Sequence, residues 1–430
     1  MSKLQNHLNP KIARLPKSST LRINEEVKDR RAKGLPVNHM GFGESPFPVP
    51  EIIKKALAEN SHLNSYPPVL GLSELRKKSL GYFGEKLGFK ANNMDCIVGP
   101  GSKDILLAAQ FAIDGDILIP TPSWVSYAPQ AMIAGTNAIR IETTSQNHHE
   151  LSGRLLENTI KKARNNGLNP RKIILNYPNN PSGLSFDKET LAEIVDVCRA
   201  NEIFVISDEI YALVSHGTKH ETIAKYYPEG TIVTTGLSKH LSLGGYRIGF
   251  GFVPKQVKGL LSSMAAFASE TWSCVSHPIQ QTAITCVEGH QMIEDHITVC
   301  TKAHGLTSNY IRKGLIDLGI DYPSLAGAFY MFPDFSRFGE YVRVNYGVKT
   351  SQELAMDLWT RESLACLPGT DFGDKPEVLS LRLAVPDYNG QAVLDFMKKN
   401  PETTPKELVE SVCPNLVKSI EILTKYFGQP

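Results

Sequence analysis

The 430-residue chain lacks any long hydrophobic segment and any excess of charge of one sign. No stretch approaches the roughly 18 to 20 consecutive apolar residues that a membrane helix needs, so we expect no membrane partner. The 46 basic and 44 acidic residues leave a formal net charge of +2, which gives no reason to expect nucleic acid as a partner. The length predicts either one large domain with a smaller one, or two to three domains of ordinary size.

Paired cysteines are lacking as well. The seven cysteines are scattered and odd in number, and no Cys-x-x-Cys pattern occurs. We therefore expect neither a disulfide framework nor a thiolate metal site, and we predict no metal. Residues 1–19 have no apolar middle region of the kind found in secretory signals. These features predict reduced thiols in a cytoplasmic protein.

Short apolar runs alternate with helical patterns through the middle of the chain. The runs are rich in β-branched residues and end at polar or turn residues, which predicts buried strands at 117–120, 173–176, 203–207, 232–235 and 248–253. Residues 187–201 have apolar side chains on one face and Asp187 in position to cap a helix. This alternation predicts an α/β fold with a mainly parallel central sheet covered by helices. Ligands of such sheets gather beyond the carboxyl ends of the strands.

The pattern changes after residue 300. A helical stretch at 298–318 is followed by strand-like segments at 327–332 and 379–384, which predicts a smaller α+β domain. We divide the chain into an N-terminal arm that belongs to the small domain, a large domain and a C-terminal small domain, at residues 1–50, 51–299 and 300–430. Within the last segment, residues 386–414 are expected to form a surface helix pair, to which we assign no function.

The segment 236–249, GLSKHLSLGGYRIG, directly follows a predicted strand. A lysine in that place is usually a surface charge, but Lys239 lies among small residues that let a bulky group approach, and Arg247 offers a rigid fork for an anion. A desolvated lysine near a cation has a lowered pKa and forms imines. The segment resembles the pyridoxal-phosphate (PLP) attachment signature of class I and II aminotransferases, the fold-type I family. That resemblance implies a three-layer fold and a Schiff base on Lys239, with Arg247 and Ser238 contacting the cofactor. Gly236 stands where the family often has a serine that touches the phosphate.

Two further strings follow strands of the predicted sheet. Taken alone, the acid in Ser-Asp-Glu-Ile-Tyr at 207–211 would be a helix cap, and Asn-Tyr-Pro-Asn-Asn-Pro-Ser-Gly at 176–183 would be turns. Both resemble family motifs. The resemblance implies that Asp208 pairs with the ring nitrogen and keeps the ring an electron acceptor. It also implies that Tyr211 and Asn180 hydrogen-bond the ring's phenolic oxygen, which lowers the pKa of the imine, and that Asn180 lies against the substrate.

A glycine-containing loop at 99–106 opens a helical pattern, and backbone amides at a helix start bind phosphate. The loop matches neither a P-loop nor a dinucleotide-binding fingerprint, which disfavours a Rossmann dehydrogenase. In the family this loop cradles the cofactor phosphate, which implies that role for Gly101, Ser102 and Lys103. An aromatic residue after a strand is more often part of the core, but the resemblance implies that Trp124 stacks on the cofactor ring. Tyr127 is expected to line the pocket beside it.

Substrate and subunit contacts follow from three more matches. Arg382, flanked by leucines, resembles the family's substrate arginine and would grip the α-carboxylate in a bidentate manner, although such a residue is often a surface charge. Gly43 would supply a backbone contact to the same carboxylate. Tyr66 resembles the tyrosine that reaches the partner subunit's phosphate, which implies a homodimer with shared active sites.

Together the motifs predict an amino-acid aminotransferase with a ping-pong cycle, in which Lys239 moves a proton from Cα of an L-amino acid to the cofactor and a 2-oxo acid is released. A PLP-dependent C–S lyase of the same fold is the alternative, and a non-enzymatic regulator on this fold is a distant one. Phe111 lies near the place where some dicarboxylate-specific relatives have a lysine, which mildly disfavours aspartate. Tyr330 and Phe329 are expected to shape the substrate pocket or to be core.

Overall fold

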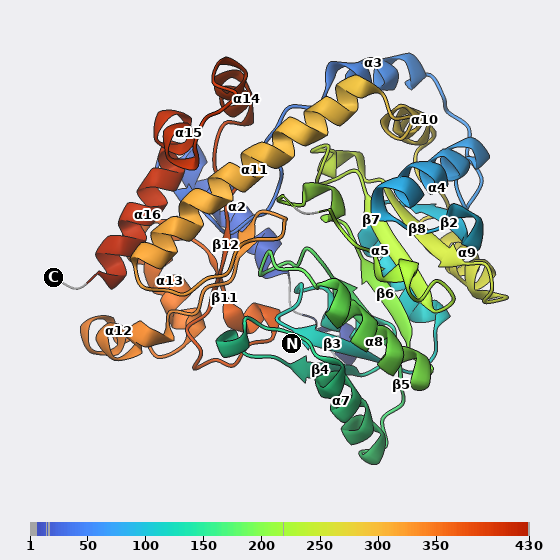
Figure 1. Cartoon of the computed structure of the whole chain (residues 1–430), viewed down its shortest axis with the longest axis horizontal. Coiled ribbons are helices and arrows are strands. Elements are labelled where there is room, and N and C mark those ends of the chain that lie inside the picture. Colours follow the sequence, from blue (N-terminus) through green and yellow to red (C-terminus); the bar gives the residue numbers. More distant parts are fainter. Residues whose placement is uncertain (1–6, 14, 16–17, 218, 429–430) are drawn as a thin grey trace.

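The computed structural model describes residues 7–13, 15, 18–217 and 219–428. These residues form two lobes, one built on a seven-stranded sheet and the other rich in helices from the C-terminal part of the chain (Figure 1). The strands of the large sheet are β2 (Met94–Gly99), β3 (Asp116–Thr121), β4 (Ala138–Glu142), β5 (Pro170–Asn176), β6 (Phe204–Asp208), β7 (Thr231–Gly236) and β8 (Gly249–Pro254). Five of them contain the predicted runs, except for the first residue of 203–207 and of 248–253, so those five strand predictions are confirmed.

The sheet has the strand order β2-β8-β7-β6-β5-β3-β4 and is mainly parallel, as predicted. Pairs from β7 through β4 are parallel, and β8 alone runs antiparallel to its neighbours β2 and β7. Alternate side chains of each strand enter different cores, because successive Cβ atoms point to opposite faces. In β5, for example, Ile173 and Leu175 enter one core and Ile174 enters the other.

Helices cover both faces of this sheet, which completes the predicted three-layer architecture. One face packs against α5 (Ser102–Ala112), α6 (Tyr127–Ile133) and α9 (Leu260–Thr271). The opposite face packs against α7 (Gly153–Asn165), α8 (Lys188–Ala200), α3 (Glu51–Asn60), α4 (Ser73–Leu87) and α10 (His277–Cys286). The cap predicted for α8 is present, since Asp187 Oδ1 accepts a hydrogen bond of 2.7 Å from the Thr190 amide.

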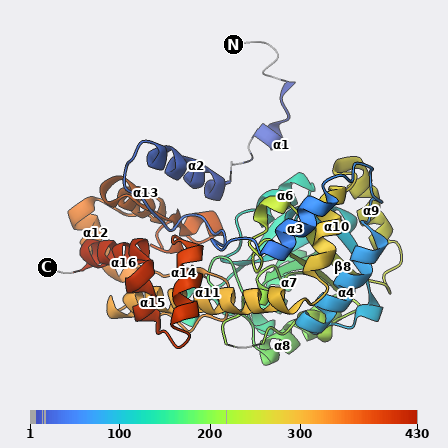
Figure 2. The same ribbon diagram turned by 90° about the horizontal axis from the view of Figure 1, so that it is seen from above.

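The second lobe has its own core, to which Met40 and Phe47 from the N-terminal segment contribute. Its small sheets join β1 (Asn38–His39) to β10 (Leu364–Ala365), and β11 (Leu367–Pro368) to β12 (Leu381–Ala384) and β9 (Tyr330–Met331). Its helices are α11 (Gln291–Asp317), α12 (Gly339–Tyr346), α13 (Ser351–Glu362), α14 (Gly390–Lys399), α15 (Pro405–Val412) and α16 (Pro414–Phe427). From the N-terminal segment come α1 (Pro10–Ala13) and α2 (Ser19–Ala32), and α2 lies along this lobe (Figure 2).

Several expected elements have different bounds in the structure. The helix expected at 298–318 begins earlier, at Gln291, and α11 runs from one lobe to the other (Figure 1). Our boundary between residues 299 and 300 therefore lies inside α11, and the domain division stays a prediction. The segment 386–414 does contain two helices, α14 and α15, and each buries one apolar face in the small-lobe core.

Short 3-10 helices connect these elements at Ala91–Asn93, Ser145–Asn147, Ala212–Val214, Ile223–Lys225, Gly244–Tyr246, Ser336–Phe338 and Gly369–Phe372. Among the residues that the structure describes, no helix combines the length and apolar character needed to span a bilayer. The same residues contain no cluster of three or more His, Cys, Asp or Glu side chains arranged to hold a metal ion.

Candidate active site

The predicted site residues converge at one edge of the sheet. Asp208 is the last residue of β6, and the strand register places it opposite Asn176 in β5 and Thr234 in β7. Lys239 follows the end of β7 by three residues, and Asn180 follows the end of β5 by four. Because parallel strands present their carboxyl ends at the same edge, residues distant in sequence meet here.

A pocket of about 180 Å³ lies at this edge, between the sheet and the small lobe. It brings together nine of the thirteen predicted site residues: Gly43, Ser102, Lys103, Trp124, Asn180, Asp208, Tyr211, Lys239 and Arg382. Tyr127, Asn176, Ile210, Phe42 and Tyr330 complete much of the lining, together with Ser18, Thr20 and Leu21 at the start of α2.

Asp208 is the buried acid of the pocket, with 3% of its surface exposed. Oδ2 accepts a hydrogen bond of 2.7 Å from the Tyr127 hydroxyl, and Oδ1 accepts one of 3.3 Å from Thr234. Burial raises the pKa of Asp208 to about 6, while the hydrogen bonds from Tyr127 and Thr234 act against the rise. The carboxylate is therefore ionised at neutral pH and has no cationic partner among the described residues, so it can hold a cationic group of a ligand.

Lys239 is the amine of the pocket. Its Nζ donates a hydrogen bond of 3.1 Å to the Gly43 carbonyl and lies 5.5 Å from the centre of the Tyr211 ring. It makes no ion pair with an acidic side chain among the described residues. The Tyr211 hydroxyl lies 2.8 Å from that of Tyr330, and burial raises the pKa of Tyr211 well above its ordinary value. Tyr211 is thus a neutral hydrogen-bond donor beside a primary amine.

Arg382 is a buried cation with no acidic partner in the described part of the chain. Only 1% of its surface is exposed; Nη2 donates to the Gly41 carbonyl at 2.5 Å, Nη1 donates to Asn180 Oδ1 at 3.3 Å, and Nε has no hydrogen-bond partner. Its guanidinium carbon lies 4.8 Å from the centre of the Tyr330 ring. Buried charges are normally paired, so this arrangement predicts an anionic ligand such as a carboxylate.

A second anion site lies at the start of α5. The helix begins at Ser102, and its N-cap residue, Gly101, has no side chain to cap the first amides. The Arg247 guanidinium packs against Gly101 and donates to the carbonyls of Gly244 (2.9 Å) and Pro100 (3.0 Å). Free helix N-terminal amides beside an arginine are a favourable site for a phosphate. The Lys103 ammonium adds positive charge, 4.9 Å from the Trp124 ring centre.

Similar proteins show the family to which the chain belongs. The model of the family "Aminotransferase class I and II" matches residues 33–395. The chain belongs to this family. It is 31% identical to an aspartate aminotransferase of Geobacillus stearothermophilus, over 85% of this chain and 92% of that protein. It is 29% identical to an asparagine–oxo-acid transaminase of Streptococcus mutans, over 88% and 94% of the two chains.

Solved structures confirm the fold of this aminotransferase. An aspartate aminotransferase from Thermus thermophilus superposes with a TM-score of 0.81 at 22% identity, covering 96% of this chain and 99% of that one. The predicted fold-type I architecture is therefore confirmed, and so is the prediction that the chain is an amino-acid aminotransferase. The roles of individual pocket residues remain predictions.

Four predicted residues of the aminotransferase lie outside the pocket lining. Gly101 and Arg247 form the adjacent anion site, and Ser238 lies half-buried just before Lys239. Tyr66 is 92% exposed, too far out to serve the pocket of its own chain.

Two further observations revise the reading of the sequence. Position 236 has no room for a side chain. It pairs with Gly249 of β8, and a Cβ there would lie too close to the Ile248 carbonyl and to Gly249. Phe111 stacks on Phe267, with ring centres 4.8 Å apart, and does not line the pocket. Within one chain, Phe111 therefore gives no reason against a dicarboxylate substrate.

Two tyrosines proved more important than their sequence context indicated. Tyr127 was expected only to line the pocket beside Trp124, but its hydroxyl donates to Asp208. Tyr330 was expected to shape the pocket or to be core, and the structure shows that it does both: it is buried, it lines the pocket and it contacts Tyr211. An aromatic residue that follows a strand indicates that it lies near the site, but no spacing rule predicts which group its hydroxyl contacts.

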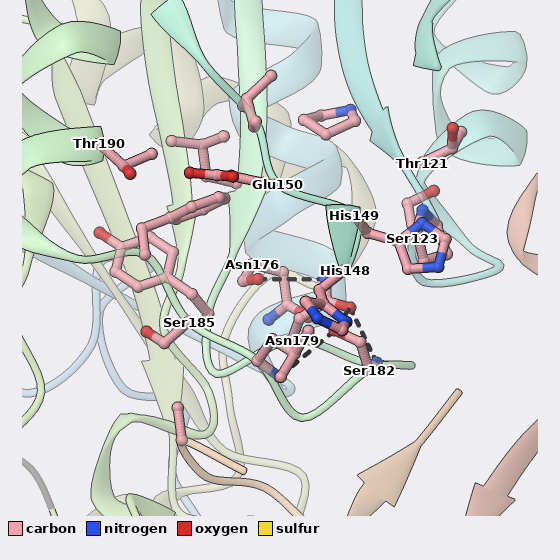
Figure 3. Close-up of a pocket in the computed structure, with 18 of the residues that line it drawn as sticks. Thr121, Ser123, His148, His149, Glu150, Asn176, Asn179, Ser182, Ser185 and Thr190 are labelled. Carbon is pink, nitrogen blue, oxygen red and sulfur yellow. Dashed lines mark hydrogen bonds between the residues drawn. The ribbon is translucent and has the colours of Figure 1, made fainter. Parts of the chain in front are cut away.

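A larger cavity of about 350 Å³ lies beside the pocket, at the ends of β3 and β5 (Figure 3). It shares Tyr127 and Asn176 with the pocket, and its wall includes His148, His149 and Glu150. Its lining contains no lysine or arginine and none of the predicted site residues. It therefore provides neither an amine to bond a carbonyl carbon nor a cation to hold a carboxylate, and the smaller pocket remains the candidate active site.

Proposed function

We propose that this aminotransferase binds pyridoxal phosphate in the smaller pocket and moves an amino group from an L-amino acid to a 2-oxo acid, with Lys239 as its catalytic lysine. One observation carries the proposal. Lys239, the ionised Asp208 and the unpaired Arg382 face one pocket of about 180 Å³, which thereby offers an amine, an anion and a cation to ligands that the chain itself does not supply.

The residues present fit the cofactor. Bound pyridoxal phosphate supplies an aldehyde that bonds amines and a ring that accepts electrons from the substrate's Cα. We assign the phosphate to Arg247, Ser238 and the start of α5 (Gly101, Ser102 and Lys103), because that site offers free amides beside cations. Asp208 holds the protonated ring nitrogen, Trp124 covers a face of the ring, and Asn180 and Tyr211 donate to the phenolic oxygen.

Each side chain has a defined task in the reaction. Arg382 holds the α-carboxylate of the amino acid, with Gly43 beside it, and so orients Cα toward Lys239. Lys239 would hold the cofactor through Nζ, and the same amine, when free, would be the base that takes the proton from Cα of the amino acid. The bound cofactor would supply the carbon to which Lys239 returns that proton. The 2-oxo acid product then leaves before the second 2-oxo acid enters, which is a ping-pong cycle.

A homodimer with shared active sites completes the proposal. Tyr66 is available to a second copy, since 92% of its surface is exposed. Exposed apolar side chains on nearby helices support an interface: Phe111 of α5, stacked on Phe267 of α9, and Met132 and Ile133 of α6. Across that interface, the Tyr66 hydroxyl would reach the phosphate held by the partner.

A cytoplasmic location is the last part of the proposal. All seven cysteines are unpaired, and six of them are buried. Burial raises the pKa of several of these thiols, for example that of Cys96 to about 12, which keeps them protonated and unreactive. A chain without disulfides is typical of a reducing compartment.

The test begins with Lys239→Ala, which we expect to lower the rate of amino transfer by roughly 1,000-fold or more. The matched control is Lys255→Ala, which removes an exposed lysine whose ammonium donates to the Asn92 carbonyl and should leave the rate unchanged. Product analysis also separates a transaminase from a lyase: the first yields a 2-oxo acid and a new amino acid, the second ammonia and a thiol. Retention of near wild-type transfer by Lys239→Ala would contradict the proposal.

The donor is identified with a panel of amino acids offered with 2-oxoglutarate or pyruvate. Aspartate and asparagine come first because similar proteins are named for them, followed by aromatic, aliphatic and sulfur-containing amino acids. The measured quantity is kcat/KM for each pair.

A further inference from the structure

Tyr330 lies at the centre of a hydrogen-bonded cluster in the pocket. Its hydroxyl is 2.8 Å from the Tyr211 hydroxyl and 3.3 Å from the Gly43 carbonyl, which also accepts from Lys239 Nζ at 3.1 Å. The guanidinium carbon of Arg382 lies 4.8 Å from the centre of the Tyr330 ring. Tyr330 therefore contacts Tyr211, assigned to the cofactor oxygen, and Arg382, assigned to the substrate, and it shares the Gly43 carbonyl with Lys239.

A tyrosine hydroxyl has only one proton to donate, so the cluster has two alternative arrangements. If Tyr330 donates to the Gly43 carbonyl, then Tyr211 donates to Tyr330, and the Tyr211 proton is not available to a ligand. If Tyr330 donates to Tyr211 instead, the Tyr211 proton is free to point at a ligand. In the ligand-free chain the Gly43 carbonyl keeps a donor in both arrangements, because Lys239 Nζ also donates to it.

We propose that Tyr330 is a positioning residue: its hydroxyl donates to Tyr211 and thereby directs the Tyr211 proton onto the phenolic oxygen of the bound cofactor. A donor that itself accepts a hydrogen bond is strengthened, because the bonds of a chain polarise one another. The inference rests on the proposed function, since it needs a cofactor oxygen beside Tyr211. The charged groups facing Tyr211 are Arg382, Asp208 and Lys239, and none of them replaces the Tyr330 hydroxyl as its donor.

The test uses the enzyme reconstituted with pyridoxal phosphate and follows the absorbance of the bound cofactor as the pH is varied. The midpoint of that titration reports the proton on the nitrogen that Lys239 contributes, and a donor to the phenolic oxygen lowers it. We expect Tyr330→Phe to raise the midpoint by about 0.5 to 1 pH unit. Tyr211→Phe should raise it as well, and adding Tyr330→Phe to Tyr211→Phe should change it no further.

The control is Tyr322→Phe, which removes a buried hydroxyl that donates to the Ser182 carbonyl at 2.7 Å and lies outside the pocket lining. It should leave the midpoint unchanged. The inference is overturned if Tyr330→Phe lowers or does not move the midpoint while Tyr211→Phe raises it, or if Tyr330→Phe has the same effect with and without Tyr211. Failure of the wild-type chain to bind pyridoxal phosphate would instead refute the proposed function itself.

Discussion

The Tyr127 hydroxyl donates a hydrogen bond of 2.7 Å to Oδ2 of Asp208, and both side chains are almost completely buried. The bond joins the start of α6 to the end of β6, two elements 81 residues apart in the chain. Asp208 receives a second, longer bond from Thr234. Because burial favours the neutral carboxylic acid, these donors are what keep Asp208 ionised near neutral pH.

Replacing Tyr127 should therefore weaken cofactor binding at acidic pH. Tyr127→Phe removes a hydrogen bond to a charged group, which should raise the pKa of Asp208 above its value of about 6 by about one unit. Because a neutral Asp208 does not pair with a protonated ring nitrogen, the pH below which cofactor affinity declines should rise by the same amount. The measurement is a pyridoxal phosphate titration of cofactor-free enzyme from pH 5 to 8.

Tyr426→Phe is the matched control for that experiment. The Tyr426 hydroxyl also donates to an aspartate at 2.7 Å, but its partner, Asp357, lies in the small lobe far from the pocket. We expect no change in cofactor affinity for this variant. Equal effects of the two substitutions would show that the loss comes from general destabilisation and not from Asp208.

The raised pKa of Asp208 also predicts how the cofactor stabilises the fold. The carboxyl titrates near 3.8 when unfolded and near 6 when folded, so between these values the folded chain holds a proton that the unfolded chain has lost. The cofactor-free enzyme therefore loses stability from this group as the pH rises from about 4 to 6, on the order of 3 kcal/mol. A protonated ring nitrogen beside Asp208 removes that penalty.

The increase in melting temperature on cofactor binding should consequently be larger at pH 7 than at pH 5. Melting curves of the cofactor-free and cofactor-bound enzyme across this range test the prediction. Asp208→Asn should abolish the pH dependence, because the amide has no proton to lose. The same increment at pH 5 and pH 7 in the wild type would contradict the assigned role of Asp208.

Much of the fold could be read from the sequence because its buried strands are continuous apolar runs. The strands β2 and β4, at the two edges of the sheet, were both missed. In β4 the physical reason is that Ile139 and Ile141 face the core while the exposed Arg140 and Glu142 alternate with them. Edge strands lack the continuous apolar run of a strand that is covered on both faces.

The candidate site was predictable to a similar degree. The sequence indicated which residues lie in the pocket, but it did not predict their individual hydrogen bonds. Asp208 and Lys239 could be placed because polar residues after parallel strands converge at one edge. The contacts of the Tyr127 and Tyr330 hydroxyls could not be predicted, because they depend on the packing of α6 and β9 against the sheet. Likewise, only the folded molecule shows that Arg382 has no acidic partner in the part of the chain that the structure describes.

The buried charge of Arg382 predicts that its replacement will stabilise the fold and abolish substrate binding. Replacing a poorly paired buried ion with an apolar side chain of similar volume is often stabilising, by about 1 to 4 kcal/mol. Arg382→Met should therefore raise the melting temperature of the ligand-free enzyme and at the same time abolish saturation by the amino acid. Calorimetry and steady-state kinetics on the same preparation test both parts.

Arg312→Met provides the comparison for this variant. Arg312 Nε donates to the carbonyls of Tyr322 and Pro323, so its removal leaves main-chain acceptors without a partner and should lower the melting temperature. A lower melting temperature for Arg382→Met would mean that its bonds to Gly41 and Asn180 outweigh the cost of the buried charge.

Gly43 provides the last prediction, because its missing side chain makes room for Tyr330. A Cβ at residue 43 would overlap the hydroxyl and the adjoining ring carbons of Tyr330, and a rigid ring can make room only by moving as a whole. Gly43→Ala should therefore displace Tyr330, disturb Tyr211 and Lys239 together, and lower kcat/KM by roughly 100-fold.

Gly81→Ala, in α4 with no neighbour near the new Cβ, should leave activity unchanged and raise stability by up to about 1 kcal/mol. Gly43→Ala should also lower the melting temperature because of the clash with Tyr330, and adding Tyr330→Leu should restore it without restoring activity, since the clash is relieved but the Tyr330 hydroxyl is lost. A fully active double variant would refute the role of Tyr330.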